Sequence, residues 1–530
     1  MSSYHSLFFL FGFLPFSFCL YQITPKSKRW MSLLFLDCLL FYLISGKLIV
    51  FIIASALIMY YTGIKMDSLQ NEFDTKKKTL ERAERKELKQ QIQKKKARFL
   101  TLGAVLHIGT LLVLKYTAFF FSNLQVLFNN LNVAVSLPIP AFVLPIGISF
   151  YSFQAISYMA DVYRGTIKAD HNFFRLFLFL SFFPCLMEGP ICRYSQTAEK
   201  LWEGNSITYV NFTFGLQRIG WGVMKKRVIS DRINPLVQEL YTNFNSYNGF
   251  MMFVAAIAYT IQLYCEFSGT IDIVIGVGQV FGITLPENFK QPFFSQSISE
   301  FWTRWHITLG TWFKDYVFYP ISMSKFMKKL TLSARKKIDR YYGPVLVGGI
   351  ALFAVWLSNG LWHGVGWNYI FFGMYHFVLI LGASLITPTG QKLTEKLKIN
   401  RDGKPYRYFR IIRTSLLVII GEMFFNAHGL SSGLVMFKKL ITQFSFAPLF
   451  DGTLMNMGLD IQDYLIVGIT LVIIFAVSLL KERGVRIREE IAKKPIPVRW
   501  AFYYGLILFV IIFGAYGVGY IPMDPVYVNF

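Results

Sequence analysis

The chain has 530 residues, of which 54% are hydrophobic and 18% aromatic, and this composition excludes an ordinary soluble enzyme. The net charge of +24 would suggest nucleic acid in a soluble protein, but no aromatic-basic nucleic-acid motif occurs. Most Lys and Arg lie between apolar runs, so cytoplasmic loops and contact with anionic membrane lipids explain them better.

Apolar stretches of spanning length recur along the chain and predict roughly 11 or 12 transmembrane helices, since each span needs ~20 mostly apolar residues. The first stretch has no basic leading segment and no small-residue cleavage site, so we expect a retained span rather than a signal peptide. One or two stretches are expected to be re-entrant or interfacial, and 207–228 is a weaker candidate. The clearest stretches are 5–21, 31–46, 47–64, 99–122, 143–162, 172–188, 250–266, 268–284, 343–360, 366–386, 411–428, 461–480 and 500–520.

The positive-inside rule gives an orientation. Basic clusters near residue 28, over 76–98 and in later loops are all expected on the cytoplasmic side, which puts the N-terminus outside. We divide the chain into N-terminal transmembrane helices over 1–64, a basic cytoplasmic helix over 65–98 and a membrane core over 99–530.

The basic segment carries eleven Lys and Arg against three Glu between 76 and 98. Glu81 and Arg85 are spaced as a favourable i,i+4 pair on one helix. A solvated or lipid-skimming helix explains the pattern, and a docking surface for a soluble donor protein is the alternative.

The five cysteines include no C-x-x-C pair and lie mostly in apolar surroundings. We expect free buried thiols rather than disulfides, and we predict no metal site.

Residues 296–320 predict an interfacial or re-entrant amphipathic helix. Ser297 and Glu300 have the spacing of a capping box. Trp302, Trp305 and further aromatic residues follow at helical spacing, and Trp and Tyr prefer the headgroup level. His306 lies beside this aromatic stripe.

Two histidines are the main candidates for chemistry. His306 follows the aromatic stripe, and His363 follows a long apolar run between Asn359-Gly360 and Gly364. An ionisable residue within a membrane is a functional-site hypothesis by default, and a neutral imidazole can accept a proton from a hydroxyl. The alternative for His363 is an interfacial histidine that serves packing. The orientation places His363 toward the outer half of the bilayer and His306 nearer the cytoplasmic half.

Glu266 and Asp272 place two carboxylates in or beside an apolar run. Buried carboxylates need partners, so we expect either pairing with an arginine such as Arg304 or a role in shaping the acceptor or donor site.

Several ordered motifs resemble the membrane-bound O-acyltransferase superfamily, in its bacterial polysaccharide-acetylating branch, which is related to the teichoic-acid D-alanyl transfer protein. The motifs are Leu144–Arg164, Phe182–Tyr194, Pro286–Phe289, Phe301–Tyr316, Leu361–Gly364 and the tail Val526–Phe530. The resemblance implies an all-α polytopic membrane protein, with a ring of about 11 transmembrane helices and re-entrant or interfacial helices around a central funnel and tunnel. Residues 99–530 would form the catalytic core.

The resemblance also implies roles for individual residues. His363 matches the family's catalytic histidine, expected as general base, and His306 matches its second polar position. Substrate binding or positioning is expected of Asn359, Trp305, Trp362, Arg304, Glu266 and Ser268. The chain departs from the family pattern at Glu266, where relatives commonly have Asp, and at Asn426, where they often have Arg.

The expected reaction is transfer of an acyl group, first of all acetyl, from a cytoplasmic thioester to hydroxyls of an extracytoplasmic polysaccharide. The donor would be acetyl-CoA or the phosphopantetheine of an acyl carrier protein, with no tightly bound cofactor. An extracytoplasmic esterase-like partner of the SGNH type would complete the transfer, and membrane lipids would surround the protein in a bacterial plasma membrane. The alternatives are D-alanyl transfer to teichoic acid, and a transporter or scaffold without acyl chemistry.

Overall fold

The computed structural model describes residues 4–516. Over these residues the chain is helical apart from turns, loops and one isolated bridge between Phe289 and Trp305, so the all-α prediction is confirmed. The tail motif Val526–Phe530 lies outside the described residues. The described chain forms two compact units, one of residues 4–216 and 274–286 and the other of residues 217–273 and 287–516.

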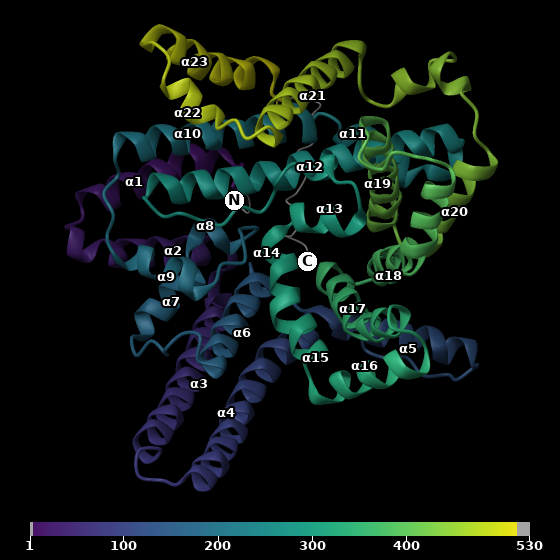
Figure 1. Cartoon of the computed structure of the whole chain (residues 1–530). Helices are drawn as coiled ribbons and strands as arrows, with labels where there is room; N and C mark the ends of the chain where they lie inside the picture. Colours follow the sequence, from purple (N-terminus) through teal and green to yellow (C-terminus); the bar gives the residue numbers. More distant parts are fainter. Residues whose placement is uncertain (1–3, 517–530) are drawn as a thin grey trace. The chain divides into compact units, whose positions relative to one another are not determined.

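The first unit contains the N-terminal helices and the hairpin that descends at the bottom of Figure 1. Its helices are α1 (Leu14–Ile23), α2 (Arg29–Ser45), α3 (Ile49–Lys76), α4 (Arg82–Leu111), α5 (Thr117–Asn130), α6 (Ile148–Arg164), α7 (Phe173–Ser181), α8 (Phe183–Leu186) and α9 (Tyr194–Trp202), with π-helices η1 (Phe8–Phe13) and η4 (Leu112–Tyr116) and 3-10 turns η2 (Lys26–Lys28) and η3 (Gly46–Leu48). One of its aromatic clusters is buried and consists of Tyr4, Phe9, Phe13 and Phe183.

The predicted single basic helix over 65–98 is interrupted by a turn over 77–81, so the segment is shared between two long helices, α3 and α4 (Figure 1). Glu81 is the N-cap of α4, and its backbone N–H donates to Glu84 at 3.3 Å in a capping box. The expected i,i+4 pair was therefore wrong, because Glu81 begins the helix rather than lying within it. The basic residues of 76–98 lie at the turn and along the N-terminal part of α4.

The second unit contains both histidines of interest. Its helices are α11 (Asn234–Thr242), α13 (Ile298–Arg304), α14 (Ile307–Phe313), α15 (Tyr319–Ser322), α16 (Lys325–Lys337), α17 (Tyr342–His363), α18 (Trp367–Lys396), α19 (Lys404–Asn426), α20 (Leu430–Thr442), α21 (Ile461–Glu482), α22 (Ile487–Ala492) and α23 (Ile496–Phe513). Shorter elements are the π-helices η5 (Lys225–Ser230) and η8 (Lys314–Phe318) and the 3-10 turns η6 (Phe244–Ser246), η7 (Pro292–Phe294), η9 (Ala447–Leu449) and η10 (Thr453–Asn456). Two further helices, α10 (Tyr209–Met224) and α12 (Gly249–Val280), each contain a boundary between the units.

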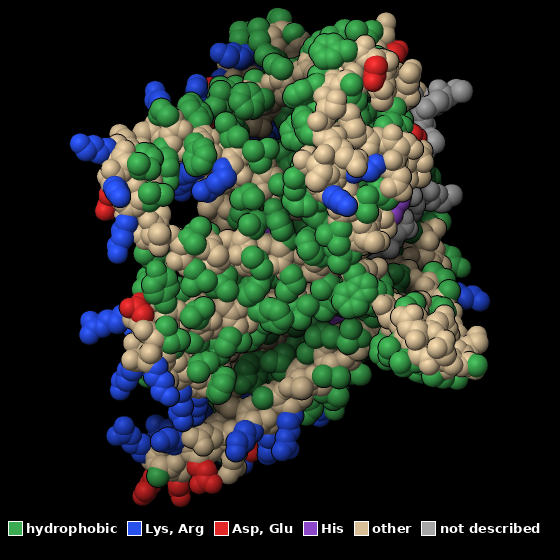
Figure 2. All heavy atoms as spheres, turned by 90° about the vertical axis from the view of Figure 1, so that its right-hand side faces the viewer, with side chains coloured by type: hydrophobic (Ala, Val, Ile, Leu, Met, Phe, Trp, Pro, Cys, Tyr) green, Lys and Arg blue, Asp and Glu red, His purple; other side chains and the backbone are tan. Residues whose placement is uncertain are grey.

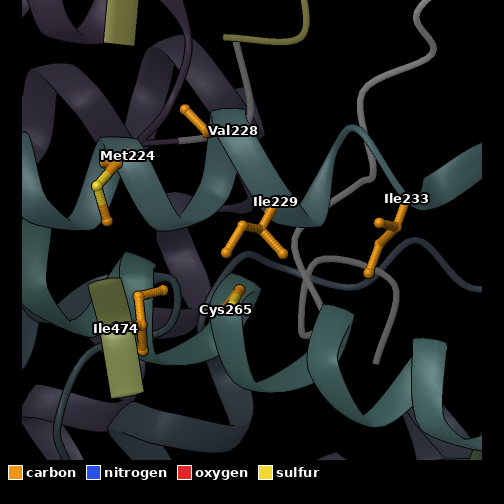
Figure 3. Close-up of a cluster of buried hydrophobic side chains, with 6 residues drawn as sticks. All are labelled: Met224, Val228, Ile229, Ile233, Cys265 and Ile474. Carbon is orange, nitrogen blue, oxygen red and sulfur yellow. The ribbon is translucent and has the colours of Figure 1, made fainter. Parts of the chain in front are cut away.

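A buried apolar cluster holds η5 against α12 and α21 (Figure 3). It consists of Met224, Val228, Ile229, Ile233, Cys265 and Ile474, and α23 packs against it through Leu506 and Phe509 among others. Because η5 is anchored in this way, the three consecutive basic residues that begin it, Lys225 to Arg227, are held in fixed directions.

Seven helical stretches in the described chain are long and apolar enough to cross a membrane, by length and composition. They are Lys26–Lys76, Arg82–Asn130, Gly249–Val280, Tyr342–His363, Trp367–Lys396, Ile461–Glu482 and Ile496–Phe513. The two expected stretches at 250–266 and 268–284 are one helix, α12. The exact number of spans stays a prediction.

Hydrophobic side chains are spread widely over the face shown in Figure 2. On α23, for example, no residue is buried, and Ile511 and Ile512 are more than half exposed. Large exposed apolar areas of this kind mark contact with a membrane or a partner, and here they accompany helices of spanning length.

Candidate active site

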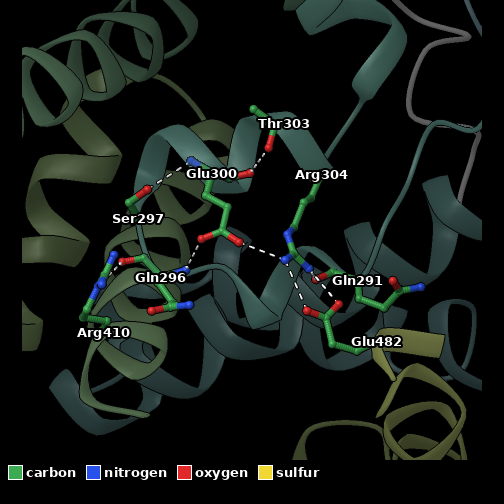
Figure 4. Close-up of polar contacts among 8 residues, drawn as sticks. All are labelled: Gln291, Gln296, Ser297, Glu300, Thr303, Arg304, Arg410 and Glu482. Atoms are coloured by element: carbon green, nitrogen blue, oxygen red, sulfur yellow. Dashed lines mark hydrogen bonds and ion pairs between the residues drawn. The ribbon is translucent and has the colours of Figure 1, made fainter. Parts of the chain in front are cut away.

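The helix that leads to His306 begins where the sequence predicts. Ser297 Oγ accepts a hydrogen bond from the Glu300 backbone N–H at 3.1 Å (Figure 4). The return contact differs from a standard capping box, because the Glu300 carboxylate accepts from the Gln296 N–H at 2.9 Å. The same carboxylate pairs with Arg304 at 2.8 Å. The start and end of α13 are thus tied together.

The predicted continuous helix over 296–320 is interrupted at His306. Helix α13 ends at Arg304 and α14 begins at Ile307, while His306 adopts a left-handed conformation with φ of 46° and ψ of 51°. For a residue with a Cβ this conformation costs roughly 1–2 kcal/mol, and such strain tends to occur at functional sites. Aromatic periodicity continues across the break, which is why the sequence pattern did not reveal it.

Asn288 holds the break in place. Its Oδ1 accepts from the Thr308 N–H at 3.0 Å and from the Thr308 Oγ1 hydroxyl at 2.9 Å, and lies 3.3 Å from His306 Nδ1. Its carbonyl accepts from the Ile307 N–H at 3.0 Å. Asn288 is fully buried. The only signal of its role in the sequence was its place in the motif Pro286–Phe289.

The His306 imidazole lies in a dry aromatic setting. Its ring centroid is 4.7 Å from that of Phe267 and 5.8 Å from that of Trp362, and the residue is only 1% exposed. Burial, and to a smaller extent the neighbouring His363, lower the pKa of His306 well below its usual value. Both effects favour the neutral form of the ring.

His363 is the last residue of α17 and contacts the same aromatic group. Its ring centroid is 5.1 Å from that of Trp362 and 5.3 Å from that of Phe425. It is 4% exposed. Trp362 therefore contacts both histidines, although they are far apart in the sequence, and the structure brings the two candidates into one site.

Close packing of α17 on α18 fixes the position of His363. A Cβ on Gly360 would lie 2.5 Å from the Tyr369 carbonyl oxygen, and one on Gly373 would lie 2.3 Å from that of Trp356. The helices can approach this closely only because these residues have no side chain.

Asn359 lies one turn before His363, so the two side chains share a face of α17. Asn359 is 6% exposed, and its Oδ1 has no hydrogen-bond partner among residues 4–516. A buried amide oxygen normally has a partner. We therefore regard Asn359 as a group that a bound substrate can engage.

Trp305 supports the site without facing solvent. Its ring stacks on Phe301, with centroids 5.4 Å apart, and meets Phe289 edge-on at 5.1 Å. Its extended backbone forms the bridge to Phe289. Trp305 thus belongs to the wall behind His306.

Arg304 turns away from this wall. Its guanidinium pairs with Glu482 at 2.8 and 3.2 Å as well as with Glu300 (Figure 4). The expectation that Arg304 would pair with Glu266 or Asp272 was wrong, because Glu482 at the end of α21 and Glu300 pair with it instead.

Glu266 and Ser268 are paired with the basic residues of η5. Glu266 lies 2.9 Å from Lys226 Nζ, which also contacts Asp231 at 3.1 Å. Ser268 accepts a hydrogen bond from Lys225 Nζ at 2.7 Å. Glu266 is fully buried, so these contacts join α12 to η5. Their predicted part in substrate positioning stays a prediction.

His376 is a further buried histidine of the second unit. Trp302 Nε1 donates to its Nδ1 at 3.3 Å, and its ring stacks on Trp356 with centroids 5.2 Å apart. It lies in the middle of an apolar run without a flanking turn, so no local pattern marked it. Its contacts link α13 to α17 and α18.

The arrangement suits proton transfer in a site that excludes water. A buried imidazole at a helix end, walled by aromatic rings and beside an amide, can orient a hydroxyl and accept its proton. No cluster of His, Cys, Asp or Glu in the described part of the chain has the grouping of a metal site.

Comparison with known proteins identifies the family. The model of the membrane-bound O-acyltransferase family, MBOAT, matches residues 165–334, which include His306. The probable alginate O-acetylase of Azotobacter vinelandii is 30% identical over 450 residues, which cover 85% of this chain and 79% of that protein. The chain belongs to the membrane-bound O-acyltransferase family. It is therefore an acyltransferase and a multi-pass membrane protein.

Two other relatives widen the range of acceptors within this family. The peptidoglycan O-acetyltransferase of Helicobacter pylori is 28% identical over 404 residues, covering 70% of this chain and 68% of that protein. The teichoic acid D-alanyltransferase of Bacillus subtilis is 31% identical over 240 residues, covering 44% of this chain and 58% of that protein. The O-acetylating relatives thus match over more of the chain.

Proposed function

We propose that this acyltransferase moves an acetyl group from a cytoplasmic thioester toward hydroxyls of an extracytoplasmic polysaccharide, with His363 as general base. The observation that carries the proposal is the contact of both His306 and His363 with Trp362 in one buried site. The acetyl group is favoured because the relatives that match most of the chain are named for O-acetylation.

In the proposed step, His363 takes the proton of the acceptor hydroxyl, and the oxygen attacks the thioester carbonyl carbon. A C–O bond forms and the C–S bond breaks, and the departing thiolate takes up a proton. His306 positions the thioester or stabilises its developing oxyanion. Asn359 orients the hydroxyl beside His363.

The donor is acetyl-CoA or an acyl group on the phosphopantetheine of an acyl carrier protein, and the enzyme needs no tightly bound cofactor. The acceptor hydroxyl belongs either to the polysaccharide or to a partner protein. We place an extracytoplasmic partner of the SGNH esterase type at the acceptor side, which passes the group to the polymer. Lipids are the remaining partners, and nucleic acid has no part.

We further propose that the protein lies in a bacterial plasma membrane with its N-terminus outside. The basic helix α16 precedes α17, and Lys396 ends α18. His363 lies at the opposite end of this helix pair from both basic segments. The positive-inside rule then puts His363 toward the outer half of the bilayer, where an extracytoplasmic acceptor can reach it.

D-alanyl transfer to teichoic acid is the second candidate. It is favoured by the 31% identity over 240 residues to the Bacillus subtilis D-alanyltransferase. A transporter or scaffold would use the same buried charges without acyl chemistry, but family membership favours an enzyme.

Ester analysis of the cell envelope and secreted polysaccharide tests the proposal. Cells lacking the gene are complemented with the wild type or with His363→Ala, and acids released by mild base are identified by mass. Loss of acetate with His363→Ala is expected. Loss of D-alanine instead would move the assignment to teichoic acid, and unchanged esters with a folded variant would contradict the general-base mechanism.

A further inference from the structure

A polar cavity lies in the second unit, next to the loop whose Asn288 side chain holds the chain at His306. Its volume is about 50 Å³, and its wall includes Arg218, Lys225, Asp272, Glu287, Ser478 and Lys481. We call it the Arg218 cavity. Phe289 also lines it, and Glu287 and Phe289 flank Asn288 in the chain. Nothing in the proposed acyl-transfer step uses these charged groups.

The inner wall is an ion-paired layer. Arg218 Nε donates to Asp272 at 2.9 Å, and Lys225 Nζ lies 2.6 Å from the other oxygen of the same carboxylate. Lys225 is buried. Asp272 is thus shared by two cations, and a third cation, Lys481, faces the cavity. Three cations against the two carboxylates of Asp272 and Glu287 leave an excess of positive charge.

Lys481 is the cation of the cavity wall that this ion-paired layer leaves without a carboxylate partner. Among residues 4–516 no carboxylate lies within ion-pair distance of its Nζ, since Glu482 pairs with Arg304 and both oxygens of Asp272 are taken. Lys481 is exposed at the end of α21, beside the Ser478 hydroxyl that also lines the cavity. An ammonium and a hydroxyl at a cavity mouth are suitable ligands for an anion.

Glu287 occupies the position that an anion would take on Arg218. Its two oxygens accept from the guanidinium at 2.6 and 2.5 Å, while its side chain is 57% exposed. A guanidinium fork binds a carboxylate and a phosphate with the same two-pronged geometry. The Arg218 side chain is mostly buried while the Glu287 carboxylate is exposed, so an entering phosphate would compete with Glu287 for the same guanidinium fork.

We propose that the Arg218 cavity binds a phosphate group, that of the phosphopantetheine arm of the thioester donor, with Lys481 and Arg218 as ligands and Glu287 as the competing carboxylate. This rests on the proposed thioester donor. The phosphate of the arm is shared by coenzyme A and by carrier proteins, so the cavity would serve either donor. Bound there, the arm would lie beside the Asn288 loop that positions His306.

Calorimetric titration of the full-length protein in neutral detergent, with 4′-phosphopantetheine and with pantetheine as probes, tests the proposal. The wild type should bind the phosphorylated probe at least about tenfold more tightly, the contribution of one or two charged hydrogen bonds. Lys481→Gln should remove most of this preference. Glu287→Gln should increase it, because the competing carboxylate is gone.

Matched variants separate a specific site from a general charge effect. Lys493→Gln and Glu490→Gln change an exposed ion pair on the neighbouring α22 segment by the same charges, and should leave the preference unchanged. Equal binding of the two probes by the wild type, or a weaker preference in Glu287→Gln, would overturn the proposal.

Phosphatidylglycerol nanodiscs, compared with phosphatidylcholine nanodiscs, distinguish a lipid headgroup from the donor. If phosphatidylglycerol binding depends on Lys481 while phosphopantetheine shows no advantage, the phosphate comes from lipid and the donor assignment fails. His363→Ala should keep the preference for phosphopantetheine. If His363→Ala leaves acyl transfer intact, the proposed function is contradicted. If the same variant still prefers phosphopantetheine to pantetheine, the phosphate site is supported independently of that function.

Discussion

His306 combines two requirements in one residue, an imidazole in a buried site and a left-handed backbone. These can be separated by substitution. His306→Gly and His306→Ala both remove the imidazole and should both lose most activity. Because Gly accepts this backbone conformation without strain, His306→Gly should be more stable than His306→Ala by about 1 kcal/mol, as measured by thermal unfolding in detergent.

His428 provides the reference for this comparison. It is exposed and its φ is not positive, so the order should reverse there, with Ala equal to or more stable than Gly. An Ala variant at position 306 as stable as the Gly variant would show that the backbone conformation is not retained.

Asn288 should matter for both stability and activity. In Asn288→Ala the buried Thr308 N–H and hydroxyl lose their acceptor, which should cost about 1–3 kcal/mol in unfolding free energy. His306 would lose its position, so the acyl-transfer rate should also fall. Asn243→Ala is the control, because Asn243 is exposed and its side-chain amide donates to the carboxylate of Glu239. Wild-type activity in Asn288→Ala would contradict the role of Asn288 in positioning His306.

Individual site residues were predictable from the sequence where an ionisable side chain lies in apolar surroundings. His306 and His363 stood out because a membrane chain rarely carries idle ionisable groups. Asn288 did not stand out, because its partners are brought to it only by the fold. The pairing of Glu266 with Lys226 was also missed, since neighbouring helices rather than sequence spacing decide which cation reaches a buried carboxylate.

The α17–α18 crossing is the element on which the position of His363 depends. Gly373→Ala should destabilise the protein by about 1–3 kcal/mol, as overpacking does, and should lower activity by displacing α17. Gly382→Ala in the same helix has open space around its Cβ. It should be neutral or stabilising by up to about 1 kcal/mol. Similar unfolding temperatures for the two variants would contradict this packing.

Helices were predictable from the sequence where a capping residue or an apolar composition marks them. Ser297, for example, marks the start of α13. The break at His306 was hidden, because one left-handed residue leaves the aromatic periodicity almost unchanged. The α3–α4 turn was hidden for a related reason. Residues 77–81 contain no Gly or Pro, and the turn is marked only by the capping box of Glu81 and Glu84.

At the scale of the whole molecule, the orientation can be tested with two single-cysteine variants in a background without the five natural cysteines. Thr79→Cys lies at the exposed basic turn, and Val365→Cys at the partly exposed loop after His363. A membrane-impermeant maleimide should label Val365→Cys on intact cells and Thr79→Cys only after permeabilisation. Labelling in the opposite order would invert the orientation and the proposed sides for donor and acceptor.

The all-α membrane architecture followed from composition alone, because apolar stretches of spanning length admit few other structures. The division into two units did not, and neither did the continuous helix α12. Both depend on long-range packing, which hydropathy does not record. The functional conclusion rests on family membership together with the aromatic site that the two histidines share. Each of them alone supports it less strongly.

The most direct test of a single two-histidine site is the rate of acetyl transfer by His363→Ala, by His306→Ala and by the double variant, with His428→Ala as control. Groups that act as a unit are not additive. His363→Ala should lose about 10²–10⁴ in rate, with little further loss in the double variant, and His428→Ala should match the wild type. Wild-type activity in His363→Ala, or losses that multiply in the double variant, would contradict a shared catalytic site.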